Sequence, residues 1–451
     1  MTRLFAPRWA IAISLAVWAV LRLVAPISYD VGPSVGAILL LASYIGFFFA
    51  GTFLYSYLAR FHGRAEYPAF QKAARVRNER VFHDRFVRGV FLVFLTMALI
   101  GLALRFYDLF VAKSFFSFES VSDFKINYDE NLVSFGPASV ISAVLVPFSA
   151  ALVLLSGYFK ERLALSWRVA AYVTVGLFVA YFALRGGRTA ITLMLLMFLT
   201  GVALAGKLTA KGLKSSLNKK LVVLGVALLV FFVYSMSLLT ERLEIMGFTA
   251  TAGLEYLESH HHVIISDTVW DLASGSDWFA VVVYTAVSLV HYFIHGYYQF
   301  FLLVQTFDTE NFTWGATQFY PLFKFFGVLG FDTVSAAELF NLVEEPGVYS
   351  TFFGPVFMDF GYWGFLYCFV LGIVCQMSWL KAQSYHPFHL MLYPYCASVL
   401  FHSSFLNMIR GGMGMYFLVA VVLAGFILRV AARYSVREGA DHTQERAAVP
   451  S

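Results

Sequence analysis

Two arginines in the stretch LRGGRTAI have the types and spacing of an anion-binding site. Arg185 and Arg188 flank a Gly-Gly pair between two long apolar runs. Glycine permits a tight chain reversal, and a helix beginning at Thr189 would point its free N–H groups at that turn. A helix N-terminus with two guanidinium groups is suited to binding an anion, which is the interpretation we favour. The alternative is that both arginines only snorkel to lipid headgroups.

Other titratable side chains offer acid–base chemistry. Asp359 lies near the start of a predicted late helix, in MDFGYWG, and His402 lies inside the next one, in LFHSSFLN. Each is a candidate general base, because ionisable groups in apolar surroundings are frequently functional. Each also has a structural alternative. A carboxylate suits the positive end of a helix dipole, and a histidine in an apolar helix is at least as often a satisfied core residue.

Metal chemistry and cofactors are not predicted. His291 and His295 are four residues apart, but the zinc-protease helix needs a glutamate directly after the first histidine, and Tyr292 stands there. The three cysteines all lie in apolar runs without CxxC spacing.

The elements that must position these residues are membrane helices. The 451 residues are 60% hydrophobic and only 13% charged, which excludes an ordinary soluble domain. Many apolar runs approach the roughly 18 residues that cross a bilayer core. We predict an all-α polytopic membrane protein, with an uncleaved first helix and no nucleic-acid partner. Ten spans are expected: 9–27, 34–58, 87–105, 136–157, 169–184, 189–206, 221–239, 357–380, 388–406 and 414–432.

The loop charges predict the orientation of these spans. Alternate loops hold 23 of the 32 Lys and Arg but only 7 of the 27 Asp and Glu: 1–8, 59–88, 159–168, 207–220, 381–387 and 429–451. By the positive-inside rule these loops, and both termini, are cytoplasmic. The other face is acidic, so its arginines stand out: Arg185, Arg188, Arg242 and Arg410. Alternatively, Arg242 only forms an ion pair with neighbouring glutamates, which would contribute little.

The outer face is expected to carry large loops with short helices lying along the membrane. The stretch 278–305 is apolar enough to span once, which would invert everything after it. It is therefore expected to be re-entrant or interfacial. Alternatively, it pairs with 315–331 as two more crossings, which would give twelve spans. The predicted regions are N-terminal helices, central helices with the Arg-Gly-Gly-Arg tip, a large outer region, C-terminal helices and a tail: 1–135, 136–240, 241–356, 357–433 and 434–451.

Three motifs make the chain resemble the Wzy-type polymerases of bacterial polysaccharide repeat units. LRGGRTAI resembles the family's Arg-Thr motif at the start of a span. GYYQFF with WGATQFYPLFKFFGVLG is similar to its outer-loop Tyr/Gly segments. PGVYSTFFGPVFMDFGYWGFLYCFVLG resembles its aromatic-Thr…Asp-Phe-Gly motif. The resemblance covers roughly residues 180–375.

This resemblance implies an enzyme of the bacterial inner membrane that works at the periplasmic face without a metal. Its donor and acceptor are undecaprenyl-diphosphate-linked oligosaccharides, and its products are O-antigen or capsule-type chains of lipopolysaccharide and polysaccharide biosynthesis. A chain-length regulator and a flippase are implied partners, together with membrane lipid.

Residues are carried over from the motifs by position. Arg188 matches the motif arginine, and Tyr349, Thr351 and Asp359 match the late motif, whereas Arg185 departs from the family pattern. Tyr298, Glu345, Arg242 and Arg410 are further expected substrate contacts. The general base is left open among Asp359, Glu344, Glu345, His402 and the histidines near His260.

Two other functions compete with polymerisation. An O-antigen ligase would share the donor site and differ in the acceptor. A transporter of lipid or polysaccharide would need charged residues buried along a pathway in mid-span. The charged residues here lie almost wholly at the ends of the predicted spans, which favours an enzyme.

Overall fold

The structure is a computed structural model of the chain. It describes residues 2–30, 32–63, 76, 78, 81–112, 137–184, 189–206, 233–234, 236–237, 239–241, 243–245, 247–343 and 349–447. The predicted Arg-Gly-Gly-Arg tip, Arg242, Glu344, Glu345 and most of the predicted span 221–239 lie outside these residues.

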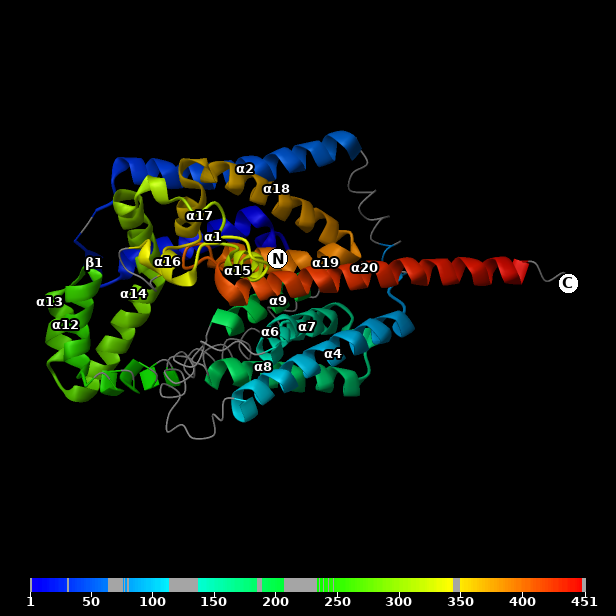
Figure 1. Cartoon of the computed structure of the whole chain (residues 1–451), viewed down its shortest axis with the longest axis horizontal. Coiled ribbons are helices and arrows are strands. Elements are labelled where there is room, and N and C mark those ends of the chain that lie inside the picture. The colour runs from blue at the N-terminus through cyan, green and yellow to red at the C-terminus, as the bar shows by residue number, and fades with distance from the viewer. Residues whose placement is uncertain are drawn as a thin grey trace.

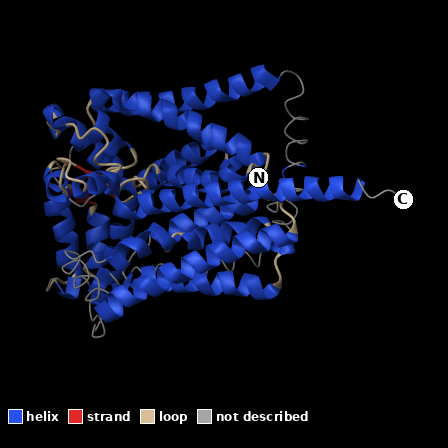
Figure 2. Cartoon of the chain, turned by 45° about the vertical axis from the view of Figure 1, so that its right-hand side comes forward, coloured by secondary structure: helices blue, strands red, loops and turns tan. Residues whose placement is uncertain are grey.

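Helices make up nearly all of the described chain (Figures 1 and 2). The long helices and those that pack with them in the bundle are α1 (Pro7–Val24), α2 (Val35–Gly63), α4 (Asp84–Phe106), α6 (Pro137–Leu145), α7 (Phe148–Tyr158), α8 (Leu165–Leu184), α9 (Thr189–Leu204), α14 (Asp277–Thr306), α18 (Gly364–Gln383), α19 (Pro387–His402) and α20 (Gly411–Ala447). Short helices are α12 (Ala250–His261), α13 (Asp267–Ala273), α15 (Tyr320–Val328), α16 (Ala336–Asn341) and α17 (Phe353–Phe360). In the described part of the chain, eight helices are long and apolar enough to cross a membrane. The predicted all-α polytopic membrane protein is confirmed.

The bundle is organised around α19, which packs against α1, α9, α18 and α20. Most side chains of α19 are buried, because a helix that is apolar on every side is stable only when its neighbours cover it. On one side of the bundle α2 lies along α18, and on the other α4, α6, α7 and α8 pack together (Figure 1). Gly51 and Gly372 lie where α2 and α18 meet, each facing the partner backbone.

One end of the bundle is covered by α14, which runs crosswise to the other helices (Figures 1 and 2). Trp18, in the second half of α1, donates from Nε1 to the Ile294 carbonyl at 3.2 Å. Gln305 Nε2 lies 3.5 Å from the carbonyl of Gly32, in the connection between α1 and α2. From Ile294 to Gln305, about 16 Å of α14 therefore lies against this end of the bundle. The stretch 278–305 lies across the bundle, and we call this end the α14 end.

The structure gives the length of the helix in the second of the two predicted further crossings. The helix within 315–331 is α15, whose nine residues give a length of about 13 Å, less than half the thickness of a bilayer core. Because α14 itself is long and apolar enough to cross a membrane, the number of crossings in this region stays a prediction.

A short sheet and a second apolar cluster complete the α14 end. β1 (Ile27–Tyr29) pairs antiparallel with β2 (Val263–Ile265), and Ile27 lies opposite Ile265. These residues pack with apolar side chains of α12 and α14. The short helices expected in the region after residue 240 are therefore present as α12 and α13.

Candidate functional site

A small cavity lies at the α14 end, where α9 begins and α19 ends. Its volume is about 70 Å³, which is room for a few water molecules. The start of α9, the middle of α14 and the turn after α19 supply its walls: Thr189, Thr192, Leu289, Tyr292, Phe293, His402, Phe405 and Leu406. Most of this lining is apolar, so a polar group in it acts in a medium of low dielectric constant.

His402 is the histidine of the cavity wall. Its Nδ1 lies 2.8 Å from the Ser398 carbonyl oxygen. Because a carbonyl only accepts hydrogen bonds, Nδ1 carries the proton in the neutral ring and Nε2 keeps a lone pair. Thr192 Oγ1 lies 3.1 Å from that Nε2. This arrangement equips His402 to accept a proton at Nε2.

The turn after His402 is fixed by backbone contacts to the segment before α17. Phe352 donates its N–H to the Ser403 carbonyl at 2.8 Å, and Thr351 forms a parallel bridge with Leu406. Thr351 has a φ of 60°, which a β-branched residue adopts only where its surroundings hold it. Since Thr351 is 1% exposed, its contribution to the site is to shape this turn.

Arg410 ends the same turn, and its guanidinium has no side-chain partner among the residues that the structure describes. Its backbone N–H donates to Asn407 Oδ1 at 3.1 Å. The guanidinium makes no hydrogen bond and no ion pair with any described residue. Burial lowers the pKa of Arg410, and nearby Asp359 and Tyr349 oppose that effect. A partly buried guanidinium without a hydrogen-bonded counter-ion is suited to binding an anionic group.

Tyr349 links Arg410 to the cavity. Its ring contacts Tyr292 of the cavity wall, with ring centroids 5.6 Å apart, and it is 39% exposed. The structure therefore brings three predicted site residues, His402, Tyr349 and Arg410, to the same part of the α14 end.

Asp359 is completely buried, and three hydrogen bonds occupy its carboxylate. Thr313 donates from Oγ1 to Oδ1 at 2.5 Å. The Thr317 N–H donates to the same oxygen at 2.8 Å, and the Gln318 N–H donates to Oδ2 at 3.0 Å. Asp359 does not line the cavity. Although the sequence predicts a catalytic base here, this geometry favours a positioning role. We call Asp359 and these three partners the Asp359 clasp.

The Asp359 clasp reaches the turn that carries Arg410. Gln318 Oε1 accepts hydrogen bonds from Asn407 Nδ2 at 3.2 Å and from the Tyr367 hydroxyl at 3.1 Å. Asn407 Oδ1 in turn accepts from the backbone N–H of Arg410. A chain of hydrogen bonds therefore connects Asp359 to the backbone of Arg410 through Gln318 and Asn407.

Tyr298, predicted as a substrate contact, lies away from this cavity. Its ring stacks on Tyr29 at a centroid distance of 4.5 Å, and it is 5% exposed. Neighbouring histidines are likewise engaged, since His291 Nδ1 lies 3.1 Å from the Tyr29 hydroxyl. His262 Nδ1 lies 3.0 Å from Asp30 Oδ2. Among the described residues, no three His, Cys, Asp and Glu side chains are grouped as metal ligands.

Four predicted site residues lie outside the described part of the chain: Arg185, Arg188, Arg242 and Glu345. Arg188 directly precedes Thr189 in the sequence, and Thr189 lines the cavity. The roles of these four residues stay predictions.

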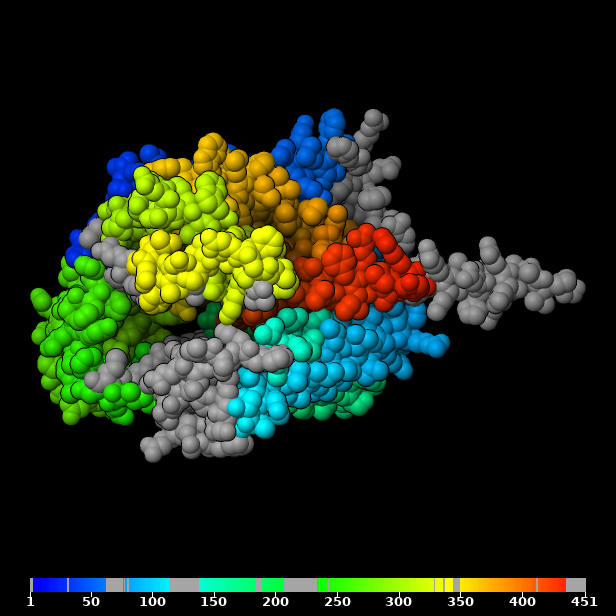
Figure 3. All heavy atoms as spheres, viewed as in Figure 1, coloured from blue at the N-terminus to red at the C-terminus, as the bar shows by residue number. Residues whose placement is uncertain are grey.

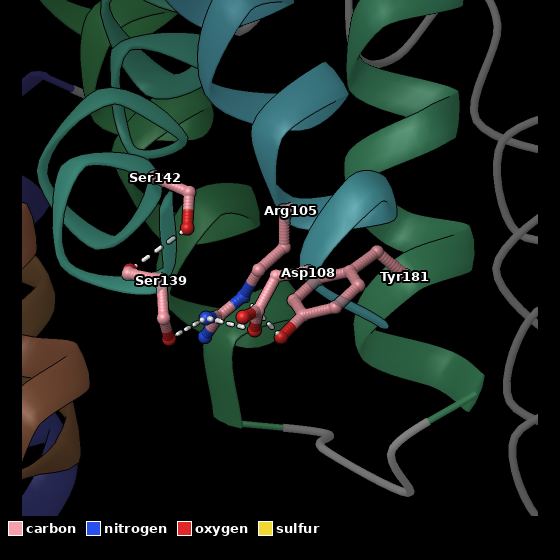
Figure 4. A network of polar contacts seen from close by, with 5 residues as sticks. All are labelled: Arg105, Asp108, Ser139, Ser142 and Tyr181. Atoms are coloured by element: carbon pink, nitrogen blue, oxygen red, sulfur yellow. Dashed lines mark hydrogen bonds and ion pairs between the residues drawn. The ribbon is translucent and has the colours of Figure 1, made fainter. Parts of the chain in front are cut away.

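Arg105, which the sequence places at the last position of a predicted span, is held in a polar network (Figure 4). Its Nε donates to the Tyr181 hydroxyl at 2.7 Å and its Nη1 to Ser139 Oγ at 2.9 Å. Asp108 Oδ2 lies 3.9 Å from Nη1. These groups join the ends of α4, α6 and α8, which makes this arginine structural.

The fold and the cavity together define a multi-pass membrane protein with a small, mostly apolar site at one end of its helix bundle. No family model, no curated protein and no solved structure matches the chain.

Proposed function

We propose that this protein is a metal-independent membrane glycosyltransferase that polymerises undecaprenyl-diphosphate-linked oligosaccharide repeat units. The observation that carries the proposal is that one turn begins after His402, whose Nε2 can accept a proton, and ends at Arg410, which has no side-chain partner among the described residues. Transfer between lipid-diphosphate sugars needs these two functions, one for the acceptor hydroxyl and one for the departing diphosphate. The motifs that resemble those of the Wzy-type polymerases support the same assignment.

The chemistry balances with the chain's own residues. The acceptor hydroxyl gives its proton to His402 Nε2, and its oxygen attacks the anomeric carbon of the donor. The bond from that carbon to the diphosphate oxygen breaks, and the electron pair stays on the diphosphate. Arg410, with Arg188 and Arg185 from the tip motif, stabilises the charge that develops there. The growing chain thus moves onto the incoming repeat unit.

The proposed enzyme lies in the bacterial inner membrane with both termini in the cytoplasm. Its α14 end then faces the periplasm, where lipid-linked units arrive through a flippase and where a chain-length regulator would act. The distribution of positive charge supports this orientation. A ligase would use the same donor groups with a different acceptor, so the test must separate the two.

The test compares surface polysaccharide on glycan gels from four strains of the host: wild type, a deletion, His402→Gln and His389→Gln. His389 is the matched control, because it is a buried histidine of the same helix whose Nδ1 contacts Ser378 Oγ and which does not line the cavity. All variants are compared at equal membrane expression. We expect a ladder in wild type and His389→Gln, and a single repeat unit in the deletion and in His402→Gln.

Other outcomes overturn the proposal in distinct ways. An unchanged ladder in the deletion removes the polymerase function. Long undecaprenyl-linked chains that accumulate without reaching the surface indicate a ligase. Single lipid-linked units trapped at the cytoplasmic face indicate a transporter. Arg188→Ala tests the tip motif in the same assay.

A further inference from the structure

We propose that residues 320–331, which we call the α15 anchor, are embedded in the bilayer at the level of the lipid headgroups. The segment comprises α15 and the turn after it, and lipid acyl chains cover its apolar side chains. This inference concerns a lipid-binding surface and does not depend on the proposed enzymatic activity.

The α15 anchor exposes an unusual density of large apolar side chains. The exposed fractions are 43% for Leu322, 57% for Phe325, 46% for Phe326, 57% for Leu329 and 64% for Phe331. Ring contacts join Phe325 to Phe326 and Phe326 to Phe331, with centroids 6.1 and 6.0 Å apart. A contiguous aromatic patch of this kind is unfavourable in water and marks a contact surface.

Lipid is the occupant because the patch continues the membrane-facing surface of the bundle. α15 packs against α20, and Figure 3 shows its yellow segment on the molecular surface between α14 and α20. The spanning part of α20 itself exposes Leu423, Phe426 and Val430. A helix beside such a span meets the same lipid environment.

The composition of the α15 anchor also suits the interface between lipid and water. No Asp or Glu occurs from residue 320 to residue 331, and the one charged residue is Lys324. Exposed Trp314 precedes the segment, and Asp332 follows it directly. Aromatic rings, one cation and no acid are typical of a short helix that lies in the headgroup region of anionic lipids.

The α15 anchor is joined directly to the site. Thr317 and Gln318 of the Asp359 clasp precede it in the chain, separated from it by Phe319 alone. Through Gln318 and Asn407, the depth of the anchor in the bilayer sets the depth of Arg410. An anchor at headgroup level places this guanidinium at the depth of lipid phosphate groups.

The test measures the depth of a spin label on Phe326→Cys in the full chain, reconstituted in phosphatidylethanolamine–phosphatidylglycerol nanodiscs. The native cysteines, Cys368, Cys375 and Cys396, are all buried, and wild type treated with the same spin-label reagent gives the background. Power-saturation EPR compares collisions with oxygen, which enters lipid, and with a nickel chelate, which stays in water. Phe426→Cys on α20 is the lipid-facing control, and exposed Glu310→Cys is the aqueous control.

We expect the oxygen-to-nickel accessibility ratio of the Phe326→Cys label to lie several-fold above that of Glu310→Cys and below that of Phe426→Cys, which lies near the middle of its span. A ratio equal to that of Glu310→Cys places the segment in water and overturns the proposal. Low accessibility to both reagents shows that protein covers the segment, which also overturns it. Phe331→Cys repeats the measurement if Phe326→Cys does not fold.

Discussion

Arg410 is the residue on which the proposed transfer most depends for charge stabilisation. Replacing it with alanine should lower turnover by about 10²–10³-fold, the usual cost of removing one donor to a developing negative charge. Turnover of Arg410→Lys should lie between that of wild type and that of Arg410→Ala, because lysine keeps the positive charge but cannot make the two parallel hydrogen bonds of a guanidinium. The measurement is the rate of chain extension by purified protein with lipid-linked repeat units.

Arg429→Ala, on α20 at the end of the bundle opposite the α14 end, is the matched control and should keep full turnover. If Arg410→Ala also keeps full turnover, Arg410 is not a ligand of the diphosphate.

We expect Asp359 to contribute to the stability of the fold and not to proton transfer. Asp359→Asn replaces one accepting oxygen with a donor, so one N–H or hydroxyl of the clasp loses its partner. We expect the free energy of unfolding to fall by about 1–3 kcal/mol, measured as a lower denaturation midpoint in detergent. Asp308→Asn is the control, because Asp308 also accepts a backbone N–H but at an exposed position. A base with no structural role would lose turnover at unchanged stability.

The sequence predicts some of these residues and misses others for a physical reason. His402 is conspicuous because a titratable group interrupts an apolar helix. The burial of Asp359 is not predictable, since its partners are contributed by a segment more than 40 residues away. Thr192 gives no signal at all, because it enters the site only through the packing of α9.

At the scale of elements, the contact between α2 and α18 depends on glycine. A Cβ at Gly51 or Gly372 would overlap the backbone of the opposite helix, and small residues are what permit such close approach in membranes. Gly372→Ala should cost about 1–3 kcal/mol through overpacking. Gly46→Ala on α2 is the control, because nothing lies near the added carbon. Equal thermal stability of the two variants in detergent would contradict a tight interface.

The Arg105 network gives a second prediction at this scale. The side chain of Asp108 is only 4% exposed, so Arg105→Met should leave a buried carboxylate without its neighbouring cation, at a cost of about 3–5 kcal/mol. Arg105→Met combined with Asp108→Leu should recover part of that loss. A double-mutant cycle of unfolding free energies measures the coupling, and strict additivity would show that the two side chains do not interact.

Spans are predictable where length and hydropathy suffice, but breaks within a span and the angle at which an apolar helix lies in the bundle are not. The break between α6 and α7 falls at Val146 and Pro147, where proline cannot continue the hydrogen-bond ladder. Hydropathy alone predicts one continuous span over 136–157. α14 has the composition of a span, and only its contacts with Trp18 and Gly32 show that it lies across the bundle.

At the scale of the whole molecule, the charge distribution and the covered end together predict a single orientation. Green fluorescent protein at the C-terminus should fluoresce, because that end is expected in the cytoplasm. Alkaline phosphatase inserted at Gly275, in the connection between α13 and α14, should be active because that connection is expected in the periplasm. Inactive phosphatase at Gly275 with active phosphatase at the C-terminus would invert the assignment and move the proposed chemistry to the cytoplasm.

The small volume of the cavity beside His402 bears on how much lipid-linked donor the proposed enzyme would lose to hydrolysis. A base that accepts a proton from a sugar hydroxyl accepts one equally well from water, and the cavity has room for a few water molecules. Each such event would release free sugar and waste an activated unit. Phe293, Phe405 and Leu406 line the space around His402 with apolar surface, which offers water no hydrogen-bond partner. The fraction of donor lost to hydrolysis would therefore be set by these three apolar side chains and not by the histidine.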